Sequence, residues 1–294
     1  HLVEALRDRG DDVTGLAQYN SFDSYGWMDE IDGIRKVRGD VRDAENMRSL
    51  IAGHELVFHL AALISVPDSY ERPRSYIDTN VTGTLNVLMA CREAGAKLVH
   101  TRTSEVYGPA QYTPMDEKHP INPQSPYAAS KVAADALVQS FVKSYGMQAV
   151  TLRPFNTYGP RQSERAVIGA ICRQKIDPLC PMIELGRTDT VRDFVYVADT
   201  VAAFLAVSRF AGGTFNAATG IGTKIGSLVS GKMNSLAYAR LRPVDSEVSE
   251  LVGDASLLRN AADWQPRVSL PDGVRLTEEW WRTRTYRRDL GMVA

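Results

Sequence analysis

The chain has 294 residues, with 44% hydrophobic and 23% charged side chains, a balance typical of one large or two modest globular domains. Its net charge of -1 gives no indication of a nucleic-acid or anionic-membrane partner. The three cysteines lack metal-ligand spacing and favour reduced thiols, and no apolar run reaches the roughly 18 residues of a membrane-spanning helix. We therefore expect a cytoplasmic protein without a metal, nucleic-acid or membrane partner.

The first residues of the chain predict a helix that leads into a strand. Residues 1–10 have an amphipathic pattern that ends at Gly10, and residues 12–16 are typical of a short strand. This order indicates the second half of a βαβ unit, whose first strand and glycine-rich phosphate-binding turn would come earlier. We expect that a segment of about 10–20 residues, sized from the βαβ unit, precedes these residues in the complete protein.

Apolar runs and helical patterns then alternate along the chain. The runs predict buried strands at 56–62, 97–101 and 149–153, and the apolar spacing between them predicts helices at 75–94 and 130–145. Such alternation is typical of a doubly wound parallel sheet of the Rossmann type, with helices on both faces. Ligands of these sheets bind beyond the carboxyl ends of the strands.

The pattern changes after Pro154, where proline and glycine interrupt shorter apolar segments. We expect a strand at 214–217 and helices at 254–264 and 271–281. There is no internal repeat, so the second half is not a copy of the first. These features predict a smaller C-terminal α/β lobe.

The sequence Tyr127-Ala-Ala-Ser-Lys131 is the strongest local indication of chemistry. Residues four apart share one face of a helix, so the lysine ammonium can lie beside the phenol. A nearby positive charge lowers the pKa of a phenol, and a phenol whose pKa is near neutrality can act as a general base on a hydroxyl group. Alone the pair is a weak signal, because many surface helices contain one.

Further motifs stand in a fixed order around this pair. They are Gly39–Asp43 (GDVRD), His59–Ala62 (HLAA), Thr103–Gly108 (TSEVYG), Ser125-Pro126, Arg153–Arg161 (RPFNTYGPR) and Arg192–Asp199 (RDFVYVAD). The ordered set resembles the extended short-chain dehydrogenase/reductase family of NAD-dependent nucleotide-sugar epimerases and dehydratases, from His1 to about Trp281. Within that family the chain is most similar to UDP-N-acetylglucosamine 4,6-dehydratases of legionaminic-acid-type pathways, in residues 19–22, 27–29, 110–119 and 160–168. Arg242-Pro and Ser246-Glu-Val also resemble GDP-mannose 4,6-dehydratases.

The resemblance implies how the chain is divided and assembled. Residues 1–155, with part of 186–212 returning to them, would form the dinucleotide-binding Rossmann domain. Residues 156–294 would mainly form the lobe that binds the nucleotide-sugar. The helices expected at 75–94 and 130–145 would pair two subunits in a homodimer.

The resemblance also implies catalytic roles. Tyr127 matches the catalytic base, and Lys131 matches its partner, which also holds the nicotinamide ribose. Thr103 matches the residue that hydrogen-bonds the reacting sugar oxygen. Glu105 matches the carboxylate with which 4,6-dehydratases remove the C5 proton and which epimerases do not need. Ser104 stands where many dTDP-glucose dehydratases have Asp, so either Glu105 or a bound water is left as the general acid.

For the cofactor, the resemblance implies contacts from residues near the ends of the predicted strands. They are Asp40 and Val41 for adenine, Leu60, Ala61 and Ala62 for the pyrophosphate and ribose, Asn80, Pro154, and again Tyr127 and Lys131. Ala17, followed by Gln18, occupies the place where the family often has an acidic residue for the ribose 2′-hydroxyl. No arginine stands there to favour a 2′-phosphate, so we expect NAD, with NADP left open.

For the substrate, the resemblance implies that Asn156, Arg192 and Arg242 contact the nucleotide diphosphate, because an arginine fork suits phosphate oxygens. Arg102 departs from the family, which commonly has a small hydroxyl residue immediately before Thr103. Alternation along a strand places Arg102 opposite Thr103, so we expect its side chain to point outward.

The activity implied is a nucleotide-sugar 4,6-dehydratase acting on UDP-N-acetylglucosamine. Three alternatives remain open. A 4-epimerase would use the same tyrosine, lysine and threonine without Glu105, and a UDP-glucuronate decarboxylase has a similar framework. A non-catalytic dinucleotide-sensing protein would not need Tyr127 and Lys131 in register with Thr103.

Overall fold

The computed structural model describes residues 1–229, 233–236, 243 and 246–289. It divides into two compact units, each built from several stretches of the chain. Unit 1 contains residues 1–106, 125–153 and 201–215, and unit 2 contains residues 107–124, 154–200 and 216–294. None of the helices in the described part of the chain is long and apolar enough to cross a membrane.

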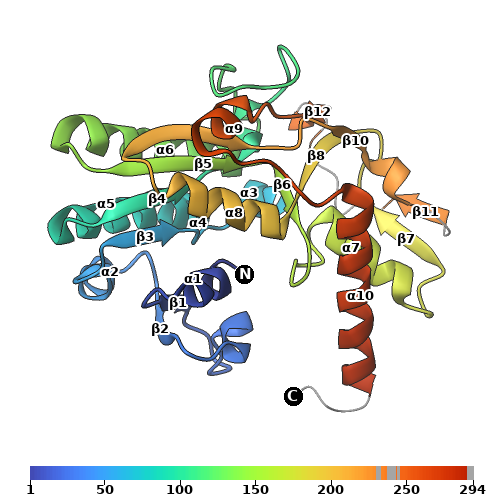
Figure 1. Cartoon of the computed structure of the whole chain (residues 1–294). Coiled ribbons are helices and arrows are strands. Elements are labelled where there is room, and N and C mark those ends of the chain that lie inside the picture. The colour runs from blue at the N-terminus through green and yellow to red at the C-terminus, as the bar shows by residue number, and fades with distance from the viewer. Residues whose placement is uncertain (230–232, 237–242, 244–245, 290–294) are drawn as a thin grey trace. The chain divides into compact units, whose positions relative to one another are not determined.

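Unit 1 has parallel strands alternating with helices, which confirms the predicted α/β class (Figure 1). Its elements are α1 (Leu2–Arg9), β1 (Thr14–Gln18), η1 (Gly26–Glu30), β2 (Arg35–Gly39), α2 (Ala44–Ile51), β3 (Leu56–His59), α3 (Val66–Glu71), α4 (Pro73–Tyr76), η2 (Ile77–Thr82), α5 (Gly83–Ala94), β4 (Lys97–Thr101), η3 (Ser104–Tyr107), α6 (Pro126–Tyr145), β5 (Ala149–Pro154), α8 (Val197–Val207) and β9 (Gly212–Ala217). Four of them, η3, β5, α8 and β9, also extend into unit 2.

The strands of unit 1 form two sheets. One has the order β3-β4-β5-β9, and the other is the parallel pair β1-β2. Among the described residues no strand joins β1 to β3. The main core lies where α2, α5 and α6 pack, and it includes Leu88, Leu98 and Val138. On the other face of the larger sheet, Phe204 of α8 contacts Phe58 of β3 edge to face.

Two expected elements of unit 1 differ from the structure. The strand expected at 56–62 ends at His59, and the residues after it form a loop. The helix expected at 75–94 is interrupted by η2, a π-helical segment in which Asn80 is buried. A π-helical segment adds a residue to the turn, so it changes which side chains face inward.

Unit 2 holds the shorter, irregular elements expected after Pro154. They are β6 (Asn156–Tyr158), α7 (Val167–Ile176), β7 (Met182–Leu185), β8 (Val191–Tyr196), β10 (Gly222–Lys224), η4 (Ile225–Leu228), β11 (Met233–Leu236), β12 (Glu250–Leu251), α9 (Ser256–Ala262) and α10 (Leu270–Asp289). Strand β8 pairs with β6, β10 and β12, and β7 pairs with β11. Helices α7 and α10 pack together. The strand predicted at 214–217 lies in β9, which pairs in the larger sheet with the strands of unit 1, and the predicted helices match α9 and α10.

Candidate active site

Helix α6 begins with the residues that carry the strongest sequence signal. Ser125 caps the helix, since its hydroxyl accepts a hydrogen bond from the Ala128 amide at 3.1 Å, and Pro126 occupies the first turn. Tyr127 and Lys131 follow one helical turn apart, and both are buried. The cap fixes the start of the helix, so the two side chains hold their relative position.

Lys131 joins α6 to the carboxyl end of β4. Its Nζ donates a hydrogen bond to the Thr101 carbonyl at 2.7 Å. Burial lowers the pKa of this amine to about 8; the carboxylate of Asp135 opposes the shift, and the guanidinium of Arg102 adds to it. An ammonium has three N–H donors, of which the carbonyl takes one, so the group suits a ligand that presents hydroxyls at this edge.

Tyr127 lies in a small apolar cluster with Val66 and Tyr76. Its ring meets that of Tyr76 edge to face, with centroids 6.2 Å apart. The Tyr76 hydroxyl donates a hydrogen bond of 2.5 Å to the Ser65 carbonyl, which anchors this neighbour to the start of α3. This packing holds the ring of Tyr127 against α3 and α4.

Asn80 connects three segments of unit 1. Its Oδ1 accepts from the Leu63 amide at 2.8 Å, and its Nδ2 donates to the Leu63 carbonyl at 3.0 Å and to the Ser130 hydroxyl at 2.9 Å. Ser130 in turn donates to the Tyr127 carbonyl at 2.7 Å. The π-helical segment, the loop after β3 and helix α6 are thereby fixed together. Sequence analysis identified Asn80 but missed Ser130, whose position inside the Tyr127–Lys131 motif was the available signal.

Thr103 and Glu105 follow β4 directly. The Thr103 Oγ1 accepts a hydrogen bond from the Glu105 amide at 3.2 Å, which begins the short helix η3. Ser104 is buried, whereas Thr103 and Glu105 are partly exposed. These residues lie within four positions of Thr101, the residue that Lys131 contacts, so both groups of predicted catalytic residues flank the same strand end.

The residues predicted to contact adenine lie after β2. The Asp40 carboxylate accepts from the Arg42 side chain (Nε–Oδ1 2.9 Å), and this hydrogen bond lowers the pKa of Asp40. Beside it is an open cleft of about 440 Å³, lined by Asp40, Arg42, Asp43, Asp78 and Thr82. Val41 is a core residue, and a Cβ on Gly83 would lie only 2.7 Å from its side chain. Glycine thus lets α5 approach the residues that line this cleft.

The segment Leu60–Ala62 lies in the loop after β3 and not in the strand. Leu60 is 45% exposed and Ala61 is exposed, while Ala62 is partly buried. Carboxylates in an open cleft can accept hydrogen bonds from the adenine amino group and ribose hydroxyls, the uncharged loop end leaves room for the pyrophosphate, and the lysine at the next strand end suits the nicotinamide ribose. These residues therefore fit the predicted cofactor.

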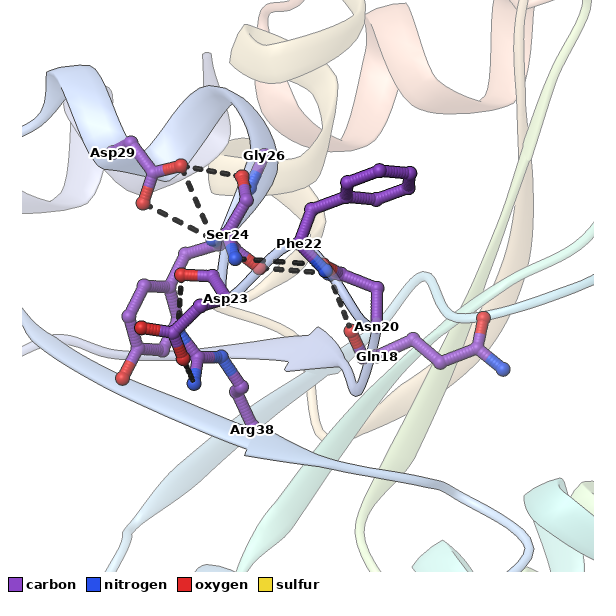
Figure 2. Close-up of polar contacts among 9 residues, drawn as sticks. Gln18, Asn20, Phe22, Asp23, Ser24, Gly26, Asp29 and Arg38 are labelled. Atoms are coloured by element: carbon purple, nitrogen blue, oxygen red, sulfur yellow. Dashed lines mark hydrogen bonds and ion pairs between the residues drawn. The ribbon is translucent and has the colours of Figure 1, made fainter.

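An arginine that sequence analysis missed stands beside Ala17. Arg38 is the register partner of Ala17 across the β1-β2 pair. Its guanidinium binds both the carboxylate and the backbone carbonyl of Asp23 (Figure 2). It also lies 4.4 Å from the centroid of the Tyr25 ring. Only the register of β1 and β2 brings Arg38 beside Ala17, because the two residues are far apart in the sequence.

The loop that presents Asp23 is held by its own polar side chains (Figure 2). Asn20 donates to the Ser24 carbonyl at 2.8 Å and accepts from the Phe22 amide at 3.0 Å. Asp29 accepts from the Ser24 hydroxyl at 2.5 Å and from the Tyr25 amide at 3.0 Å. These bonds fix the backbone on which Asp23 reaches Arg38.

The residues predicted to bind the nucleotide diphosphate lie in unit 2. Asn156 of β6 donates to the Asp193 carbonyl at 3.2 Å. Arg192 of β8 is buried, with Nη1 donating to the Val191 carbonyl at 2.9 Å and Nη2 lying 3.6 Å from Glu247. Pro154 is the last residue of β5, and Arg242 lies outside the described residues. The roles of these residues stay predictions.

Arg102 does not point outward as predicted. It is only 4% exposed, and its guanidinium is paired with Asp135, which is 2% exposed, on the helix that carries Tyr127 and Lys131. The strand β4 ends at Thr101, so the alternation of side chains does not extend to Arg102.

Comparisons with known proteins identify the family. A family model described as GDP-mannose 4,6 dehydratase matches residues 1–277. A UDP-glucose 4-epimerase of Mycolicibacterium smegmatis is 32% identical over an alignment of 305 positions, which covers 97% of this chain and 95% of the relative. A dTDP-glucose 4,6-dehydratase of Mycobacterium tuberculosis is 33% identical over 275 positions, covering 85% and 79%. The crystal structure of a Thermus thermophilus UDP-glucose 4-epimerase in complex with NAD has a TM-score of 0.81 at 29% identity, covering 96% of this chain and 94% of the other. The chain therefore belongs to the GDP-mannose 4,6 dehydratase family, among the NAD-dependent nucleotide-sugar epimerases and dehydratases of the short-chain dehydrogenase/reductase type that its motifs predicted.

Proposed function

We propose that the chain is a nucleotide-sugar 4,6-dehydratase. The observation that carries this proposal is Glu105, a carboxylate two residues after Thr103 at the strand end that Lys131 contacts. An epimerase that only inverts C4 has no use for a base near C5. Both activities occur among the relatives, so the carboxylate is the feature that favours dehydration.

The first step requires a base for the C4 hydroxyl, and Tyr127 supplies it. The ammonium of Lys131 stabilises the phenolate and holds the ribose of the cofactor, while Thr103 orients the sugar oxygen by a hydrogen bond. A bound NAD would supply the hydride acceptor for C4 and the hydride donor for C6 within one turnover. The protein's contribution is to position these groups and to stabilise the charge that develops.

The second step removes water across C5 and C6. The C4 ketone acidifies the C5 proton, which Glu105 takes as the C6–O bond breaks. The leaving hydroxide needs a proton, which the newly protonated Glu105 or a bound water supplies. A proton from solvent then adds at C5, hydride returns to C6 and the proton held by Tyr127 is released to solvent, which gives a 4-keto-6-deoxy sugar.

UDP-N-acetylglucosamine is the substrate that we propose, because residues 110–119 and 160–168 resemble dehydratases that act on it. Asn156 and Arg192 of unit 2, with Arg242, are proposed to bind the diphosphate. A UDP-glucuronate decarboxylase remains the second enzyme alternative. A non-catalytic dinucleotide sensor is disfavoured by the joint presence of Thr103, Glu105, Tyr127 and Lys131.

The complete protein should convert one member of a nucleotide-sugar panel to a product lighter by one water. The panel contains the UDP, dTDP and GDP forms of glucose and of N-acetylglucosamine, with GDP-mannose and UDP-glucuronate, and product mass is the readout. Loss of carbon dioxide instead of water would indicate the decarboxylase. Unchanged mass with inversion at C4 would indicate the epimerase and contradict the proposal.

We propose NAD as the cofactor, and Arg38 gives a physical reason. A 2′-phosphate beyond β1 would need an available guanidinium, whereas that of Arg38 is engaged by Asp23 and stacked on Tyr25. Asp23→Ala should release Arg38 from the carboxylate, while the backbone carbonyl and the Tyr25 ring still contact the guanidinium. It should lower the Kd for NADP by about threefold to tenfold and change that for NAD little, because the ion pair is partly exposed and screened. Isothermal titration with each cofactor measures both constants.

The double variant Asp23→Ala with Arg38→Met is the control for this prediction. It lacks the released guanidinium, so its affinity for NADP should return to the wild-type value. Equal NADP affinity in the single and double variants would show that Arg38 has no role in the choice between NAD and NADP.

The homodimer through α5 and α6 and the cytoplasmic location stay predictions.

A further inference from the structure

The carboxylate of Asp193 is completely buried in unit 2, on strand β8. Its Oδ1 accepts hydrogen bonds from the backbone amide and the hydroxyl of Thr219, at 3.0 and 2.6 Å. Its Oδ2 accepts from the backbone amides of Gly220 and Gly253, at 2.9 and 3.2 Å. Burial raises the pKa of this carboxyl group, and the four donors oppose that shift because they bind the ionised form. A carboxylate has about four acceptor sites on its two oxygens, so these donors use its full capacity.

The donors belong to two strands that flank β8 in the sheet of order β10-β8-β12. Thr219 and Gly220 lie just before β10, and Gly253 lies just after β12. A Cβ on Gly253 would lie 2.4 Å from the ring of Phe155, so a larger residue could not bring this amide as close. The side chain of Asp193 therefore ties the ends of both neighbouring strands to β8.

Arg192, a predicted ligand of the diphosphate, stands between the same two strands. It is the register partner of Thr223 in β10 and of Leu251 in β12. Successive side chains of a strand point to opposite faces, so those of Arg192 and Asp193 leave β8 on opposite faces. Nη2 of Arg192 lies 3.6 Å from Oε1 of Glu247, which precedes β12 in the chain. A shift of β12 would therefore move both the backbone beside Arg192 and a carboxylate that contacts its guanidinium.

We propose that Asp193 is a positioning residue for substrate binding. By tying the ends of β10 and β12 to β8, it holds the backbone around Arg192 so that the guanidinium can bind the diphosphate of a nucleotide-sugar. Asn156, a second predicted ligand of the diphosphate, is joined to the same residue, because its Nδ2 donates to the Asp193 carbonyl at 3.2 Å. The inference rests on the proposed function, from which it takes the roles of Asn156 and Arg192.

Asp193→Asn tests the proposal. Asparagine has nearly the same shape, but its NH2 group would face backbone N–H donors, so the bonds on one side of the carboxylate are lost. We expect the Kd for UDP to rise by about tenfold, because one of the strand ends beside Arg192 is released. The Kd for NAD, most of whose predicted contacts lie in unit 1, should change by less than about twofold. Isothermal titration of the complete protein measures both constants, with dTDP and GDP titrated beside UDP so that the tightest-binding nucleotide is used.

Asp199→Asn is the matched control, because it replaces another buried carboxyl group of unit 2. Asp199 lies in the first turn of α8, and its Oδ2 accepts from the Val268 amide at 3.1 Å. Neither of these residues belongs to β8, β10 or β12. Both variants should lower the Tm, measured by circular dichroism, because each deprives a backbone amide of its acceptor. Only Asp193→Asn should weaken the binding of UDP, and where turnover is found it should raise KM and leave kcat nearly unchanged.

An unchanged Kd for UDP in Asp193→Asn would overturn the proposal. An equal rise in Asp199→Asn would also overturn it, since that result would indicate a general loss of stability. If Asp193→Asn does not fold, Thr219→Val is measured in its place; this variant removes the hydroxyl donor, keeps the shape and should raise the Kd by about threefold.

A rise confined to the variants at Asp193 and Thr219 supports the proposal even if no nucleotide-sugar is converted, and that combination would count against the proposed function alone. Turnover by the wild type with an unchanged Kd in these variants would leave the proposed function standing and remove the role of Asp193. A wild-type protein that binds none of the three nucleotides would overturn both.

Discussion

Replacing Glu105 with glutamine should stop the loss of water while sparing the oxidation at C4. Glutamine keeps the shape of the side chain and a carbonyl oxygen, but it cannot accept the C5 proton at neutral pH. Tyr127, Lys131 and Thr103 are unchanged, so the first oxidation remains possible. We expect the rate of product formation to fall by about 10²- to 10⁴-fold, the usual range for a general acid–base group.

Three measurements distinguish this result from a general loss of function. The absorbance of reduced nicotinamide should accumulate when the variant is mixed with substrate, while little 4-keto-6-deoxy sugar forms. Solvent deuterium should enter C5 with the wild type and hardly at all with the variant. Glu93→Gln, an exposed position that pairs with Arg48 on the surface, is the matched control and should behave as the wild type. Product formation at the wild-type rate in Glu105→Gln would show that another group is the base.

Sequence alone predicted the elements whose signals are local. Strand β4 matches its predicted range because Lys97–Thr101 is a short apolar run that is buried on both faces. The helix at 75–94 was predicted without interruption because hydrophobic spacing does not reveal a π-helical segment such as the one around Asn80. The strand after Leu56 was predicted to be too long, since apolar residues continue into the loop at Leu60.

The candidate site could be predicted only in part, because some of its contacts join segments that are far apart in the sequence. Tyr127 and Lys131 are on one helix, and Thr103 and Glu105 follow one strand, so short motifs identify them. The hydrogen bond from Asn80 to Ser130 and the pairing of Arg102 with Asp135 join segments 50 and 33 positions apart. Such contacts depend on how helices pack on the sheet, which one sequence does not specify. Arg38 beside Ala17 similarly required the register of two strands.

Tyr127→Phe should lower the rate of product formation at least as much as Glu105→Gln does. It should block an earlier step of the reaction. The variant lacks only the phenolic oxygen, so the edge-to-face contact with Tyr76 and the packing of α6 are retained. Without this base the C4 hydroxyl keeps its proton, so hydride transfer from C4 is blocked and neither reduced nicotinamide nor product accumulates. We expect a loss of about 10²- to 10⁴-fold in the rate of the first oxidation, measured by stopped-flow absorbance of the nicotinamide.

Tyr145→Phe is the matched control, because it makes the same substitution at the exposed C-terminal end of α6. It should leave the first oxidation unchanged. Cofactor binding by Tyr127→Phe should stay close to the wild type, since Lys131 still holds the ribose in our proposal, and isothermal titration checks this. The two variants then separate the steps: Glu105→Gln stops after reduction of the nicotinamide, and Tyr127→Phe stops before it. Rapid reduction of the nicotinamide in Tyr127→Phe would exclude Tyr127 as the base and leave Glu105 or a bound water to accept the C4 proton.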